Sequence, residues 1–188
     1  MDYAGLSVAE AQARFFDANG MPADGGYAAR RWAIKLGWLE IPVPNFRWRR
    51  RAVPIHDLHH IVTGYECSPI GEMEIAAWEC AAGGFSNPFA TLFCMPLVAL
   101  GAPIAPTRVF TAFLIGRRSR TLYSMMPVPG FLDTSVNALR TRLLPAFRPA
   151  ALPRDRLAFA WLMCRSLLAL GLMLSPCIAG VAIVATLR

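Results

Sequence analysis

Four side chains with metal-binding chemistry fall in one short stretch of the chain: His56, Asp57, His60 and Glu72. On a helix, His56 and His60 are four residues apart and share a face, and Asp57 is a neighbour of His60 at a spacing of three. Two imidazoles and a carboxylate on one turn can chelate a divalent cation without any movement of the backbone. Taken alone, the same turn is also compatible with a polar helix face that binds no metal.

Glu72 can join this turn only if the chain reverses direction between His60 and Glu72. In one continuous helix, a residue twelve positions later would lie about 18 Å away along the axis. Pro54 suits the first turn of a helix and Gly64 its end, while Ser68 and Pro69 suit the start of a second helix. The sequence therefore predicts a helical hairpin that carries Glu72 back toward the two imidazoles.

The ligand types restrict the metal. Two histidines and two carboxylates suit zinc, iron or manganese, whereas calcium prefers more oxygen ligands and copper(I) prefers sulfur. Glu66, Glu74 and Glu79 could support the site from outside, although we interpret them as surface or capping charges. His59 is expected to point away from the site.

The spacing resembles a known motif. His56-Asp57-x-x-His60, eleven residues and Glu72, together with Thr63-Gly64-Tyr65 and Gly71, are similar to the signature of the coenzyme Q protein four family of ubiquinone biosynthesis. The resemblance implies an all-helical, membrane-associated protein that binds a metal, usually zinc, through the four motif positions. It covers about residues 50 to 80 and is faint near Phe15-Phe16.

The family replaces the carboxyl group of a polyprenylated hydroxybenzoate ring by a hydroxyl group and associates with other quinone-biosynthesis proteins. The resemblance thus implies a metal-dependent oxidative decarboxylase acting on a polyprenyl aromatic lipid. The alternative is a non-catalytic lipid-binding scaffold for quinone-biosynthesis enzymes. In either case, the apolar stretch from Phe85 to Ile104 would shelter the isoprenoid chain.

Helix signals dominate the rest of the chain, and we predict an all-α fold with a compact domain over residues 1–150. A capping box at Ser7-Glu10 predicts a helix over residues 8–18. Further helices are predicted over 27–38, from Pro106 to about Ser124, and from an N-cap at Asp133 to a point before Pro145. Prolines exclude a helix over 41–46, and they divide residues 81–107 into short helices.

Residues 151–188 form a basic linker followed by a hydrophobic helix. From Ser166 to Leu187 there are 22 residues without a charge, close to the roughly 20 residues that span a bilayer. Arg154, Arg156 and Arg165 precede this segment, which predicts a main domain on the cytoplasmic face of the bacterial membrane. The alternative is a buried C-terminal helix in a soluble domain.

The net charge of +7 and the mean hydropathy of +0.40 also favour an anionic membrane surface as partner. We find no nucleic-acid-binding signature, so nucleic acid is not an expected partner. The basic clusters could bind lipid headgroups, and the candidates are Arg49, Arg50, Arg117, Arg118 and Arg120; the run around Trp48 could equally be a solvated charge run. Five scattered cysteines are expected to be reduced, and a homodimer is possible.

Overall fold

The computed structural model describes residues 2–36, 39–85, 87–125 and 129–186. Helices dominate these residues, and their one sheet is a two-stranded hairpin, so the all-α prediction is confirmed. In chain order the elements are α1 (Val8–Ala18), β1 (Arg31–Leu36), β2 (Leu39–Pro44), α2 (Arg47–Thr63), α3 (Pro69–Ala81), α4 (Pro88–Ile104), α5 (Pro106–Gly116), η1 (Leu122–Ser124), η2 (Phe131–Asp133), α6 (Val136–Leu143) and α7 (Pro153–Thr186).

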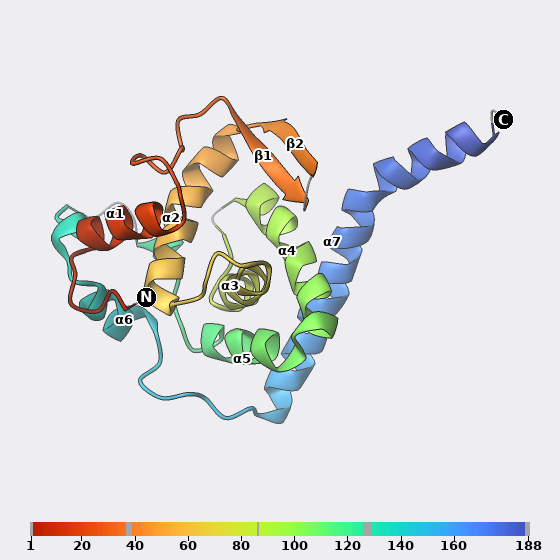
Figure 1. Cartoon of the computed structure of the whole chain (residues 1–188). Coiled ribbons are helices and arrows are strands. Elements are labelled where there is room, and N and C mark those ends of the chain that lie inside the picture. The colour runs from red at the N-terminus through yellow and green to blue at the C-terminus, as the bar shows by residue number, and fades with distance from the viewer. Residues whose placement is uncertain (1, 37–38, 86, 126–128, 187–188) are drawn as a thin grey trace.

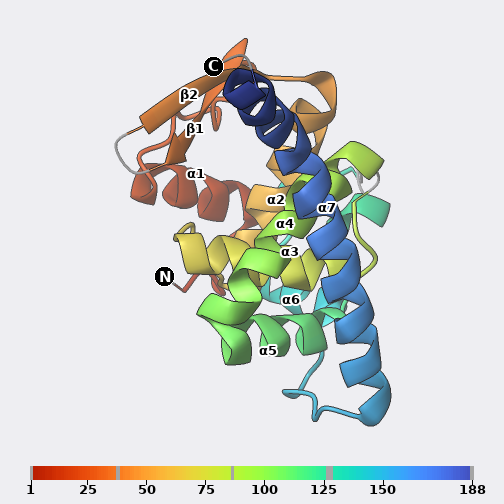
Figure 2. The ribbon, with the colours of Figure 1, turned by 90° about the vertical axis from the view of Figure 1, so that its right-hand side faces the viewer.

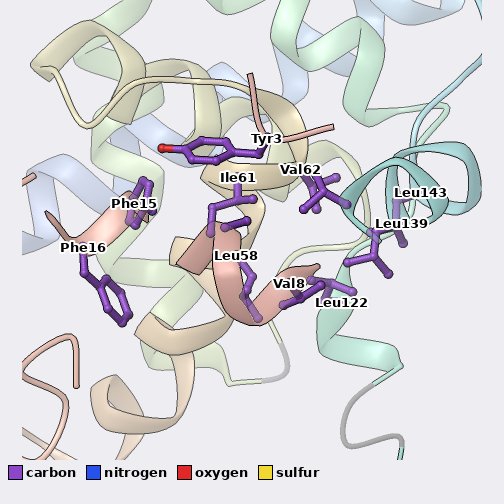
Figure 3. Packing of buried hydrophobic residues seen from close by; sticks show 12 residues of the cluster. Tyr3, Val8, Phe15, Phe16, Leu58, Ile61, Val62, Leu122, Leu139 and Leu143 are labelled. Carbon is purple, nitrogen blue, oxygen red and sulfur yellow. The ribbon is translucent and has the colours of Figure 1, made fainter. Parts of the chain in front are cut away.

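The helices form two groups with separate apolar clusters. Helices α1, α2 and α6 lie on one side of the molecule, and α3, α4, α5 and α7 lie on the other (Figures 1 and 2). The first cluster joins Phe15 of α1, Leu58 and Ile61 of α2 and Leu139 of α6 (Figure 3). The second cluster is built around Trp78 of α3. Helices α2 and α3 therefore meet where the two clusters adjoin.

Helix α2 has one apolar and one polar buried face. Leu58, Ile61 and Val62 belong to the first cluster. His59 and His60 are buried as well, and hydrogen bonds or ion pairs link them to carboxylates of α3. Buried polar groups are costly unless they are hydrogen-bonded, so the α2–α3 contact must be built from paired polar groups. This polar seam holds the candidate site.

The predicted hairpin between α2 and α3 is confirmed. Gly64 ends α2 with a left-handed φ of 79°, and its N–H donates to the carbonyl of His60. Ser68 caps α3 by accepting from the N–H of Gly71, and Pro69 is the first residue of the helix. A Cβ on Gly71 would collide with the carbonyl of Glu66, so this close return of the chain requires glycine. Helix α2 starts earlier than predicted, at Arg47, and Pro54 lies inside it.

The helix predicted over residues 27–38 is wrong. Residues 31–36 pair instead with residues 39–44 in an antiparallel hairpin, from Arg31 opposite Pro44 to Leu36 opposite Leu39; residues 37 and 38 lie outside the described residues. Pro42 and Pro44 exclude a helix, as predicted, but they are compatible with a two-stranded sheet because both of its strands are edges. The hairpin lies beyond the N-terminal end of α2 (Figure 1).

Several other helix boundaries differ from those that Pro and Asp predict. The helix over 8–18 is confirmed, with both bonds of its capping box. However, α4 is one helix of 17 residues that contains Pro96 and Pro103, not a set of short helices. Helix α5 already ends at Gly116, and α6 is capped by Ser135 rather than Asp133.

The C-terminal helix α7 is long and apolar enough to cross a membrane. An 18-residue window within its segment Pro153–Pro176 has a mean hydropathy of 1.9, and only 17% of that window is buried. Leu162 and Ala169 pack into the second cluster, whereas Leu157, Trp161 and Leu168 are at least 66% exposed. Helix α7 runs along α4 and then projects beyond the other helices (Figures 1 and 2).

Asp155 ties the first turn of α7 to the end of α5. Its buried carboxylate accepts from Arg118 at 2.6 Å and from Arg117 at 2.9 Å. Three hydrogen bonds, from Arg118, from the N–H of Leu152 and from Arg117, hold the pKa of Asp155 well below its usual range.

We expect this carboxylate to make the fold acid-sensitive. A lowered folded-state pKa contributes stability above the unfolded value, near pH 3.9, and that stability is lost as the pH falls further. The melting temperature of the full chain in detergent should therefore drop between about pH 5 and about pH 3 more for wild type than for Asp155→Asn. The control is Asp133→Asn, at an exposed position, which should behave as wild type. Equal acid sensitivity of wild type and Asp155→Asn would contradict the assignment.

Candidate metal centre

Three side chains converge in the polar seam between α2 and α3: His56 and His60 of α2 and Glu72 of α3. One potential ligand atom from each lies within 4.8 Å of the other two. The Nε2 atoms of the two imidazoles are 3.2 Å apart, and each lies 3.3 Å from an oxygen of Glu72. The predicted return of Glu72 to the histidine pair is thus confirmed, and this group could hold a metal ion.

The outer nitrogens of both imidazoles are already bound to acceptors. Nδ1 of His60 lies 2.9 Å from the carbonyl oxygen of Tyr65, and Nδ1 of His56 lies 3.0 Å from a carboxylate oxygen of Glu79. A carbonyl and an ionised carboxylate only accept hydrogen bonds, so each Nδ1 must carry the proton. In the neutral rings, both Nε2 lone pairs then face each other and Glu72. Such a cluster of lone pairs requires a cation or a proton between them.

The distance between the two imidazole nitrogens fits a tetrahedral metal ion. Zinc binds histidine nitrogen and carboxylate oxygen at about 2.0–2.1 Å, and tetrahedral angles then separate the ligand atoms by about 3.3 Å. The Nε2 atoms of His56 and His60 are 3.2 Å apart, close to this value, and each lies 3.3 Å from a different oxygen of Glu72. Three protein ligands would leave one position of a tetrahedron open, as in catalytic zinc sites.

Glu79 supports the site from one side. Its fully buried carboxylate lies 3.0 Å from Nδ1 of His56, 2.6 Å from Nδ1 of His59 and 3.3 Å from the hydroxyl of Tyr123. His59 in turn accepts from the N–H of Leu122 through Nε2, so its proton is on Nδ1 and it is neutral. Partners of this kind fix the orientation and tautomer of a metal-binding histidine.

The charges in the seam are mutually stabilising. Burial opposes ionisation of Glu79, but His56 and His59 outweigh it and lower the pKa of Glu79 to about 2. Burial likewise opposes ionisation of Glu72, whose pKa His56 and His60 hold well below its usual range. Burial alone would lower the pKa of His56, but Glu79 and Glu72 raise it well above its usual value. For His59, burial prevails and lowers the pKa. The carboxylates thus favour a positive charge at His56.

Asp57, the fourth predicted ligand, lies outside the group of three. Its Oδ2 accepts a hydrogen bond of 2.8 Å from the hydroxyl of Tyr27, and burial raises the pKa of Asp57. Asp57 follows His56 directly, so the two side chains leave α2 about 100° apart. It remains close enough to interact electrostatically with His56 and His60.

A cavity of about 380 Å³ adjoins the site. His56, Asp57 and Glu72 form its polar part, and most of the remaining wall is apolar. The wall residues include Trp32 of the hairpin, Trp48 and Val53 of α2, Phe85, and Ala90, Phe93, Cys94 and Leu97 of α4. A mainly apolar pocket with a few converging polar groups is typical of a small-molecule site. The cavity matches a ligand with an aromatic or aliphatic body and a polar end.

The five predicted headgroup-binding arginines have different surroundings. Arg49 is half-buried and lines the cavity, whereas Arg50 and Arg120 are exposed. Arg117 and Arg118 are bound to Asp155. Arg50 and Arg120 keep the predicted chemistry toward anionic headgroups, whereas Arg49 lines the cavity and Arg117 and Arg118 pair with Asp155.

The interpretation of Glu79 as a surface or capping charge is wrong, because its carboxylate is fully buried and lies within hydrogen-bond distance of His56 and His59. His59 lies outside the group of three, as expected, and the sequence did not predict a role for Tyr27. Glu79 lies seven residues after Glu72, which is two helical turns, so both carboxylates share a face of α3. This spacing is the feature of the sequence that could have identified Glu79 as part of the site. Tyr27 carries no such signal, because only the tertiary fold brings it to Asp57.

Comparisons with protein-family models, with curated proteins and with solved structures found no match for this chain.

Proposed function

We propose that this chain is a metal-dependent membrane protein of ubiquinone biosynthesis that replaces the carboxyl group of a polyprenylated hydroxybenzoate ring by a hydroxyl group. The observation that carries the proposal is that the cluster of His56, His60 and Glu72 adjoins a mainly apolar cavity, which His56 and Glu72 line. The motif that these residues share with the coenzyme Q protein four family supports the choice of substrate.

The ligand set and its spacing favour zinc, with iron or manganese as alternatives. Bound there, the metal would act as a Lewis acid on the ring phenolate, or would activate oxygen if it is redox-active. The reaction balances with dioxygen as oxidant: two molecules of the acid and one of dioxygen give two of the phenol and two of carbon dioxide. His56, His60 and Glu72 hold the ion, and Glu79 fixes the tautomer of His56.

The apolar wall of the cavity would bind the ring and the first part of the prenyl chain. Phe85, Phe93 and Leu97 come from the stretch that sequence reasoning assigned to the isoprenoid, and all three line the cavity. Burying their apolar surface against the ligand excludes water from the reacting group.

Helix α7 would anchor the protein in the bilayer through its exposed apolar face. Arg154 and Arg156 are exposed in its first turn, and Arg165 is exposed before the uncharged segment. Basic residues on this side favour a main domain at the cytoplasmic face of a bacterial membrane. Other quinone-biosynthesis proteins would then bind it at the membrane surface.

The test is release of labelled carbon dioxide from a prenylated 4-hydroxybenzoate carrying ¹⁴C in its carboxyl group. The full chain in mild detergent, supplied with oxygen, should release the label, chelation should stop it, and zinc, iron or manganese should restore it. Glu72→Gln should be inactive, and Glu66→Gln, which changes an exposed glutamate of the connecting loop, should be active. No release with any of the metals would contradict the enzymatic proposal, and co-purification of quinone-biosynthesis enzymes would then favour the scaffold.

A further inference from the structure

Arg49 and Arg50, neighbours in a basic run, occupy different environments. Arg50 is exposed on the first turn of α2, whereas Arg49 is half-buried and lines the cavity beside the metal centre. Arg49 lies seven residues before His56, so both belong to the same face of α2, about 10 Å apart along its axis. Arg49 therefore belongs to the cavity and not to the outer basic surface.

The guanidinium of Arg49 is held in place by two contacts. It lies 4.0 Å from the ring centroid of Trp32, and its Nη1 donates to Oδ1 of Asn45 at 3.1 Å. Asn45 is buried, and its Nδ2 donates to the carbonyl oxygens of Tyr27 and Ala29. The hairpin and the segment before it thus fix the cation before any ligand arrives.

Within the part of the chain that the structure describes, most of the hydrogen-bonding capacity of this guanidinium is unused. Arginine has five N–H donors, and the bond to Asn45 uses one. None of the ion pairs found in the described parts of the chain involves Arg49. Burial without a paired carboxylate is unfavourable for the cation, and burial lowers its pKa although Asp57 opposes this. A fixed, partly desolvated cation with free donors is a receptor for a planar anion.

The walls beside Arg49 restrict which anion fits. Trp32 and Trp48 line the same cavity, and both rings lie about 6 Å from that of Phe93. Aromatic walls favour a flat aromatic ligand, whereas a free inorganic anion would leave them in contact with water.

We propose that Arg49 is the specificity-determining residue that binds the carboxylate of an aromatic acid in this cavity. The inference rests on the proposed function for the identity of the ligand as a prenylated hydroxybenzoate, but it does not require the metal. Asn45 and Trp32 act as positioning residues for the guanidinium.

The experiment compares an acid with its neutral ester on metal-free protein. The full chain in mild detergent is treated with a chelator and titrated calorimetrically with a mono-prenylated 4-hydroxybenzoate and with its methyl ester. Wild type should bind the acid more tightly than the ester, and Arg49→Gln should lose about 10- to 100-fold of this preference, the range of a charged hydrogen bond. Arg50→Gln, the matched control, should keep the wild-type preference.

Arg49→Lys tests whether an effect of Arg49→Gln comes from a collapsed cavity and not from the loss of the charge. Lysine keeps the long side chain and the charge, so this variant should prefer the acid more strongly than Arg49→Gln does. The inference is wrong if wild type shows no preference, if Arg49→Gln keeps it, or if Arg49→Lys has none. The titration contains no metal, so the two proposals can fail separately. A protein that binds no metal in a separate assay would contradict the proposed function alone. An acid preference that does not depend on Arg49 would contradict this inference alone.

Discussion

The His60→Ala protein should be purified with essentially no bound metal, whereas wild type should carry about one ion per chain. His60 offers its Nε2 to the site while its Nδ1 is bound to the carbonyl of Tyr65. Without it, two protein ligands remain, His56 and Glu72. Removing a group that only supports a ligand costs about 10- to 100-fold in metal affinity, so removing a ligand should cost more. Elemental analysis of both proteins, purified in parallel, measures the difference.

Glu72→Gln provides a second variant that keeps the shape of the side chain. It should also lower metal affinity by more than about 100-fold, while Glu66→Gln, the matched exposed change, should have no effect. Equal metal content in wild type and His60→Ala would show that the ion binds elsewhere. Loss of metal from Glu66→Gln as well would show that the effect is not specific to the predicted ligands.

Replacing Glu79 by alanine should lower the free energy of unfolding by about 3–5 kcal/mol, the usual cost of removing one partner of a buried ion pair. Glu79 has no exposed surface and lies within hydrogen-bond distance of His56 and His59. In its absence, two buried imidazole N–H groups lose their acceptor, and His56 loses the group that fixes its tautomer. Chemical denaturation of the full chain in detergent measures the first effect, and a metal titration should show a further loss of about 10- to 100-fold in affinity.

The control for Glu79→Ala is Glu66→Ala, which removes an exposed carboxylate and should change stability by less than about 0.5 kcal/mol. Glu79→Gln keeps the volume and one acceptor oxygen, so its stability should fall between those of wild type and Glu79→Ala. Wild-type stability and metal affinity in Glu79→Ala would contradict the supporting role.

The sequence was sufficient to predict the hairpin that builds the site. Gly64, Ser68 and Pro69 are local signals, since each acts through its own backbone conformation or hydrogen bond. Because they fix the ends of α2 and α3, the position of Glu72 opposite His56 and His60 follows from the spacing.

Contacts between residues that lie far apart in the sequence could not be predicted in the same way. Arg49 and Arg50 look equivalent in sequence, and only the packing of the β1–β2 hairpin with Asn45 distinguishes them. The prediction of a helix at Trp32 is wrong, and Trp32, Ile34 and Leu36 alternate with Arg31 and Lys35 at the period of a strand. The prolines of α4 predict breaks in the helix, yet the helix continues through them, because its packing against α3 and α7 stabilises it.

The X-ray absorption spectrum of the metal-loaded full chain tests the metal centre most directly. We expect nitrogen and oxygen neighbours at about 2.0–2.1 Å, with the outer scattering of two imidazole rings and about four ligands in all. A sulfur neighbour at about 2.3 Å, a shell of six or more oxygens, or a preparation that retains no metal would contradict it.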